Sequence, residues 1–126
     1  MCGTAVEAAM RTVVVVDLVK GGAPLTWPRL ESDEFLMSTG SARPLEDAYR
    51  VSQHDLVTWA AELAGWDVLD AYQLVSQAGL APVGNVVDTN YTMVAKLPKA
   101  HLGGAVVADG VHDRLRETAA AYLRER

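Results

Sequence analysis

Residues 44–64, PLEDAYRVSQHDLVTWAAELA, set the fold class, because their apolar side chains recur at helical spacing. Those that fall on one face are Leu45, Ala48, Leu56, Trp59, Ala60 and Leu63. Pro44 suits the first helical turn, where its missing N–H costs no hydrogen bond. Glu46 and Asp47 place negative charge at the positive end of the helix dipole. Gly65 can end the helix in a left-handed conformation, so we expect one long amphipathic helix here.

A second helix is predicted over residues 67–78, with Asp67 as its N-cap and Gly79 as its stop. The linker after the first helix is so short that the two helices must be close neighbours. Strands over 81–87 and 91–97 follow, joined by the turn-forming composition Asp-Thr-Asn at 88–90. A last helix is expected over about 111–124.

The part before residue 44 is rich in strand-forming residues. Residues 13–16 are four valines in a row, a pattern typical of a strand that is buried on both faces. An earlier strand over 2–7 and two short strands over 26–31 and 34–38 are also predicted. The order of strands, two helices, strands and a helix predicts a single α+β domain over residues 1–126, with the helical pair packed on an antiparallel or mixed sheet. A doubly buried strand needs neighbours on both sides, and this chain supplies few candidates, which indicates missing sheet partners from another chain or a lost segment.

Composition limits the kinds of partner. The chain has 126 residues, half of them hydrophobic, and a formal net charge of -5. Acidic and basic residues are interspersed without a basic stripe, which argues against nucleic acid as a partner. No apolar run is long enough to span a membrane. The single cysteine fits a reducing, cytoplasmic compartment.

The spacing of the polar residues indicates few candidate catalytic or binding sites. Cys2, His54 and Asp88 would provide the residue types of a cysteine-nucleophile triad, but nothing in their spacing supports that geometry. The structural alternative is a small strand cysteine, a surface histidine and a turn aspartate. Glu7 lies in a predicted strand, where a carboxylate is costly unless it is paired, used or solvent-facing. Asp88 and Asn90 lie on a loop, where either site chemistry or simple turn formation would explain them.

The three histidines are His54, His101 and His112, and they form neither an HExxH motif nor an HxH pair. A metal site built on them would need ligands from several elements. Solvated helix positions are the favoured interpretation of His54 and His112.

Four segments together resemble the C-terminal portion of the acetamidase/formamidase family. They are CGTAVE at 2–7, MSTGSARPLEDA at 37–48, WDVLDAY at 66–72, and GNVVDTNYT at 84–92 with AKLPK at 95–99. They occur in the family's order and at similar spacing, over about residues 2–102. The resemblance implies a hydrolase that acts on the carbon–nitrogen bond of small linear amides and releases a carboxylate and ammonia. It also implies a divalent metal, zinc or similar, which polarises the amide carbonyl and generates a hydroxide nucleophile.

The family's acidic Gly-Asp-Gly-Glu segment and its upstream histidines and aspartates have no counterpart in this sequence. Only Glu7, Asp88 and Asn90 carry over as candidate site-lining positions, and no catalytic residue or metal ligand can be assigned. We therefore expect a C-terminal fragment or split subunit that is inactive alone and is completed by an N-terminal amidase chain. The abrupt match from residue 2 also suggests an internal start or a split gene.

Two alternatives stay open at this point. In the first, the chain is a non-catalytic remnant that self-associates to cover its exposed strands or binds a partner chain. In the second, it is a stand-alone enzyme in which Cys2, His54 or Asp88 converge.

Overall fold

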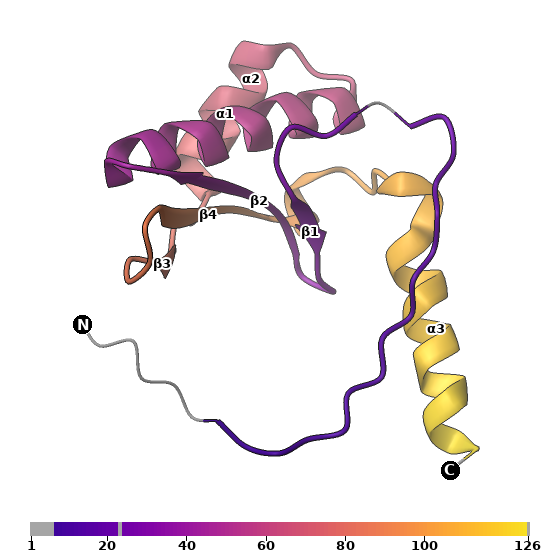
Figure 1. Ribbon diagram of the computed structural model, residues 1–126. Helices are drawn as coiled ribbons and strands as arrows, with labels where there is room; N and C mark the ends of the chain where they lie inside the picture. Colours follow the sequence, from indigo (N-terminus) through magenta and orange to yellow (C-terminus); the bar gives the residue numbers. More distant parts are fainter. Residues whose placement is uncertain (1–6, 23, 126) are drawn as a thin grey trace.

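The computed structural model describes residues 7–22 and 24–125. Its elements are β1 (Arg29–Glu31), β2 (Phe35–Ala42), α1 (Leu45–Ala64), α2 (Val68–Ala78), β3 (Val83–Asn85), β4 (Tyr91–Pro98), the short 3₁₀ helices η1 (Lys99–His101) and η2 (Ala108–Gly110), and α3 (Val111–Arg124). The strands form one antiparallel sheet in the order β1-β2-β4-β3. Helices α1 and α2 lie on one side of this sheet, while α3 points away from it (Figure 1). The predicted α+β class with a C-terminal helix is confirmed.

The core forms where α1 crosses the two long central strands. All eight residues of β2 pair with β4, so that Leu36 faces Leu97 and Ser38 faces Ala95. Alternate side chains of both strands point toward α1, as the two-residue period of a strand requires. Leu36 and Leu97 are fully buried there against Leu56 of α1.

Local signals place the helix ends to within one residue. Pro44, predicted in the first turn, is instead the N-cap with extended backbone, and α1 begins at Leu45. Gly65 ends α1 in the left-handed conformation with φ 67°, and its N–H donates to the carbonyl of Ala61. The Asp67 carboxylate accepts a hydrogen bond of 2.8 Å from the N–H of Leu69, which is the predicted N-cap of α2. The predicted last helix over 111–124 is also confirmed.

The prediction of a doubly buried valine strand is wrong. Residues 7–22 contain no strand, and Val14 and Val16 are 73% and 87% exposed. A strand needs a neighbour for its N–H and C=O groups, and the edges of the described sheet are the three-residue strands β1 and β3, neither of which pairs with this segment. The four valines correctly predict that the segment is apolar, but they do not indicate which strand, if any, pairs with it.

Strand pairing also corrects the predicted bounds of the other strands. The strand expected over 34–38 extends through Ala42, because β4 offers a partner along its whole length. The strands expected over 26–31 and 81–87 shrink to Arg29–Glu31 and Val83–Asn85. Within residues 7–22 and 24–125, no helix is long and apolar enough to cross a membrane.

Candidate functional site

Two of the predicted site residues lie together in the turn between β3 and β4. The side-chain amide of Asn85 donates to the carboxylate of Asp88, and the Asn85 side-chain oxygen accepts a bond of 2.9 Å from the N–H of Val87. Asp88 and Asn90 are both exposed. The bonds around Asp88 are those of a polar turn, and the exposed carboxylate and amide remain accessible to a ligand or to another chain. Their role in lining a site stays a prediction.

Glu7 and the residues of the possible triad come from separate parts of the chain. Glu7 lies exposed in the N-terminal segment, which has no regular secondary structure. His54 is exposed on α1, whereas Asp88 lies in the β3–β4 turn. Cys2 lies outside the described residues, and so does most of the strand predicted over 2–7. Within the described chain, no hydrogen bond or ion pair joins Glu7, His54 and Asp88.

The described residues do not fit the divalent metal that the family resemblance implies. Across residues 7–22 and 24–125, no group of three or more His, Cys, Asp or Glu side chains is placed to hold a metal ion. His101 lies exposed on η1, and His112 contacts the carboxylate of Asp33. The solvated position predicted for His54 is confirmed, whereas the same prediction for His112 is wrong, because its side chain is half-buried and lies 2.9 Å from the Asp33 carboxylate.

A groove of about 630 Å³, which the sequence pattern does not predict, separates α1 from α2. Val57 and Val75 form its buried apolar part, and Tyr49, His54 and Tyr72 lie among the residues around it. Its volume falls in the usual range of small-molecule sites. Helical spacing places Tyr72 in the apolar stripe of α2, but its side chain is more than half exposed, because α2 turns it toward the groove.

A polar cluster joins β1, β2 and α1. Arg29 donates to Asp55 through Nε at 3.0 Å and Nη2 at 2.8 Å, and the Ser38 hydroxyl donates to the same carboxylate. The guanidinium of Arg29 also lies 4.8 Å from the centre of the Trp59 ring. Partial burial favours the neutral acid, but the bonds from Arg29 and Ser38 outweigh it and hold the pKa of Asp55 below its usual value. The cluster fixes the sheet to α1.

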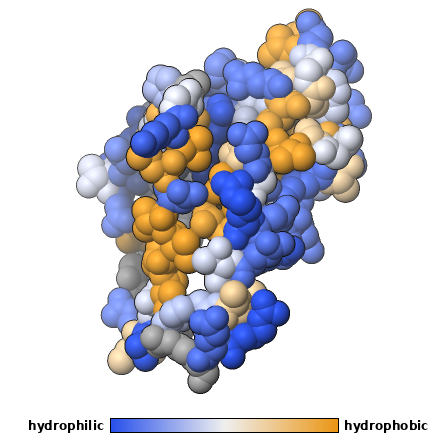
Figure 2. Space-filling model, turned by 90° about the vertical axis from the view of Figure 1, so that its right-hand side faces the viewer, coloured by the Kyte–Doolittle hydropathy of each residue, from blue (hydrophilic) through white to orange (hydrophobic). Residues whose placement is uncertain are grey.

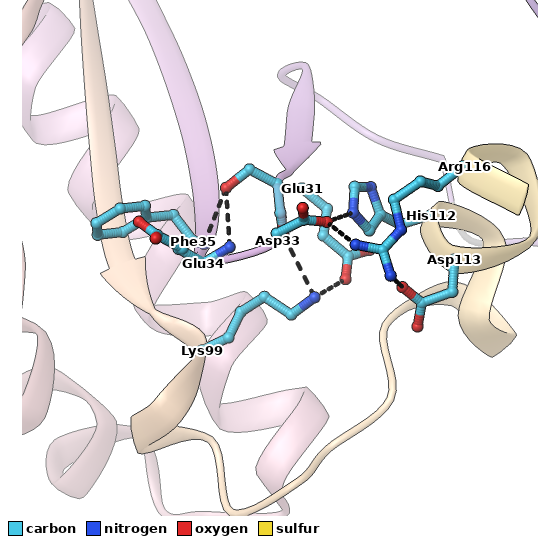
Figure 3. Close-up of polar contacts among 9 residues, drawn as sticks. Glu31, Asp33, Glu34, Phe35, Lys99, His112, Asp113 and Arg116 are labelled. Carbon is cyan, nitrogen blue, oxygen red and sulfur yellow. Dashed lines mark hydrogen bonds and ion pairs between the residues drawn. The ribbon is translucent and has the colours of Figure 1, made fainter. Parts of the chain in front are cut away.

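A second polar cluster connects the β1–β2 hairpin to the C-terminal part of the chain (Figure 3). Asp33 accepts a bond of 2.7 Å from Nη1 of Arg116 and lies 2.9 Å from Nε2 of His112. Lys99 forms an ion pair with Glu31 nearby. The hydrogen bond from His112 is the main reason why the pKa of Asp33 is lowered. These contacts hold the first turns of α3 against the hairpin.

Solved structures connect this arrangement to an enzyme family. The chain is similar to the acetamidase of Yersinia enterocolitica, with a TM-score of 0.62 and 49% sequence identity. The chain resembles part of an acetamidase. The match covers 64% of this chain but only 24% of the Yersinia acetamidase. The acetamidase of Bacillus halodurans is similar as well, with a TM-score of 0.59, 25% identity, and coverage of 64% of this chain and 27% of that one.

The chain therefore spans about a quarter of the length of the acetamidases that it matches. The resemblance inferred from the sequence segments is confirmed by these two structures. No protein-family model and no curated protein matches the chain.

Proposed function

We propose that this chain supplies the α+β part of an acetamidase/formamidase-type hydrolase, which cleaves the carbon–nitrogen bond of small linear amides to a carboxylate and ammonia. The observation that supports this proposal is the 49% identity with the Yersinia acetamidase, together with a shared fold over the matched part. Identity and fold are separate kinds of likeness, and here they point to the same family.

The chain contributes a scaffold and an exposed polar turn, and the remainder of an amidase contributes the reacting groups. Because no group of three or more metal-ligating side chains comes together in residues 7–22 and 24–125, most ligands of the implied metal would come from that remainder. Glu7 in the N-terminal segment, and Asp88 and Asn90 in the β3–β4 turn, are the exposed positions of this chain that we expect to line the completed site. The reducing, cytoplasmic location expected from the single cysteine belongs to the same proposal.

Complementation tests the proposal. The purified chain is assayed for ammonia release from formamide and acetamide, with and without zinc, and then mixed with a Yersinia acetamidase fragment that lacks the matched quarter. We expect ammonia only from the mixture, and we expect the two chains to co-elute on gel filtration. Ammonia from the chain alone would show that it needs no partner. Co-elution without ammonia release would remove the amidase assignment.

The turn is tested in the same mixture. Asp88→Asn keeps the shape of the side chain and removes its charge, and it is expected to lower the rate of ammonia release. Asp70→Asn is the matched control, because Asp70 is an exposed carboxylate in the first turn of α2, away from the β3–β4 turn. Equal rates in both variants would exclude a role for Asp88.

A further inference from the structure

The N-terminal apolar segment, residues 10–19, exposes a large amount of hydrophobic surface. Its exposed hydrophobic residues are Met10, Val13, Val14, Val15, Val16, Leu18 and Val19. Monomeric proteins rarely leave a contiguous apolar patch of this kind uncovered, and larger patches mark interaction sites. We therefore expect another chain to cover the segment.

The apolar face of α3 extends this surface. Leu115, Ala119 and Leu123 line the same hollow of about 870 Å³ as residues 13–16. Asp17 lies 4.0 Å from Arg114, so the segment runs beside the helix. Figure 2 faces the side that carries α3 and much of residues 7–22, and it shows hydrophobic side chains gathered on that side. No residue of α3 is buried in the described chain.

The chemistry of the segment favours a β-strand as its cover. β-branched side chains pack well on a pleated surface, and residues 12–16 are all β-branched. The segment belongs to none of the described strands, so its backbone groups have no ladder partner within the described chain. An extended segment with free N–H and C=O groups is a ready template for pairing with another strand.

We propose that residues 10–19 pair antiparallel with the same residues of a second copy of this chain, about a two-fold axis that passes through Val14. In this register Val14 faces Val14, and each step toward the N-terminus in one copy matches one step toward the C-terminus in the other. Met10 then faces Leu18, and Val13 faces Val15. The isologous arrangement is the commonest geometry of homodimers.

Charge complementarity selects the second copy and this register. Arg11 lies three residues before Val14 and Asp17 lies three residues after it, so each Arg11 faces an Asp17 of the other copy. Opposite charges at directly facing positions stabilise an antiparallel pair, and like charges destabilise it. The other charged residues of the N-terminal part, Glu7 and Lys20, face Gly21 and Ala8. No like charges meet between the two strands.

A shift of the register by one residue loses this match. Arg11 would then face Val16 or Leu18, and the charges of the two copies would no longer meet. Each copy also keeps Arg114 beside its own Asp17, so positive charge from α3 borders the same carboxylate. The dimer would thus bury the apolar residues of both segments while each Asp17 faces cations.

Sedimentation of the full chain alone, without an amidase fragment, tests the proposal, and its readout does not depend on amide hydrolysis. The unaltered chain is expected to sediment as a dimer. Arg11→Glu and Asp17→Arg each place two like-charge pairs in the homodimer, and each is expected to raise the dimer Kd at least about tenfold, or about 1.4 kcal/mol. An equimolar mixture of the two variants is expected to recover the dimer. In the mixed dimer the two introduced side chains, a carboxylate and a guanidinium, face each other, and the retained Asp17 of one chain faces the retained Arg11 of the other.

Two further variants test whether a lysine disrupts the dimer only within residues 10–19 or at any exposed apolar position. Val14→Lys places two ammonium groups opposite each other on the axis and is expected to give a monomer. Val106→Lys is the control, since Val106 is exposed but lies outside the segment, and it should remain dimeric. A monomeric unaltered chain, including one that binds only the Yersinia fragment, overturns the proposal. So does a mixture of Arg11→Glu and Asp17→Arg that stays monomeric.

Discussion

Gly40 of β2 lies where α1 comes closest to the sheet, and Gly40→Ala is expected to destabilise the fold. A Cβ at this position would lie 2.4 Å from the carbonyl oxygen of Ala48, 2.7 Å from the amide nitrogen of Ser52 and 3.0 Å from Cβ of Val51. Real Cβ atoms essentially never approach other atoms within 3.0 Å. Because two of the three neighbours are main-chain atoms of α1, the helix itself must move.

The cost follows from what such a movement disturbs. Ala48 and Ser52 of α1 are fully buried, and so is Leu36 of β2 beneath the helix. Overpacking of a close-packed core costs about 1–3 kcal/mol. Alanine regains roughly 0.5–1 kcal/mol through its lower backbone entropy in the unfolded chain. We therefore expect Gly40→Ala to lower the free energy of unfolding by about 1–2 kcal/mol.

Urea unfolding measures this difference at one protein concentration, with tryptophan fluorescence as the probe, since Trp59 is buried in the core. With an m-value of about 1–2 kcal/mol/M, the midpoint should fall by about 1 M. Gly22→Ala is the control, because a Cβ at Gly22 meets nothing within 4 Å. An unchanged midpoint for Gly40→Ala would show that α1 is not held at this distance, and would refute the reasoning.

Two further substitutions test the local contacts. Asp55→Asn should lower the free energy of unfolding at neutral pH by about 1–3 kcal/mol, because it removes charge-assisted bonds with Arg29 and Ser38. The folded pKa of Asp55 is lowered, so the stability that its carboxylate contributes is present above the unfolded pKa of about 3.9 and is lost as the pH falls through the folded value. In urea titrations at several pH values, Asp55→Asn should therefore lose less stability in acid than the unaltered chain. Parallel plots of stability against pH for the two proteins would contradict the assignment. Asp67→Ala removes the N-cap of α2 and should cost about 1 kcal/mol in the same assay, whereas Asp70→Ala should cost less; equal losses would argue against the cap.

The helices could be predicted because their signals are local. The bounds of α1 depend on Pro44 and Gly65, which act through their own backbone preferences, and the N-cap of α2 depends on Asp67. The strands are less predictable because a strand ends where its neighbour ends. The eight residues of β2 are set by β4, which lies some fifty residues further along the chain. The valine segment shows the limit of this kind of prediction, because a strand pattern cannot form a strand without a partner.

The polar sites also differ in whether neighbouring or distant residues determine them. The turn that holds Asp88 and Asn90 is encoded by neighbouring residues, so its turn chemistry is predictable from sequence. Arg29 and Asp55 meet across 26 positions of sequence, and neither residue type indicates the other. The groove beside Tyr72 depends on the angle between α1 and α2, which is fixed by packing and not by any short motif.

The buried core and the proposed dimer surface lie in different parts of the chain, so folding and association can be tested separately. Among the residues that the structure describes, all buried core residues lie between Leu36 and Val107, so the sheet and its two helices close their core without residues 7–22. Charge changes at Arg11 or Asp17 should therefore leave that core intact while they alter the surface beside α3. For this reason a loss of the dimer can be interpreted as a loss of strand pairing, provided that each variant keeps a cooperative urea transition with the m-value of the unaltered chain. The same surface would also be available to the remainder of an amidase, so pairing with a second copy and completion by that remainder are alternatives for one segment.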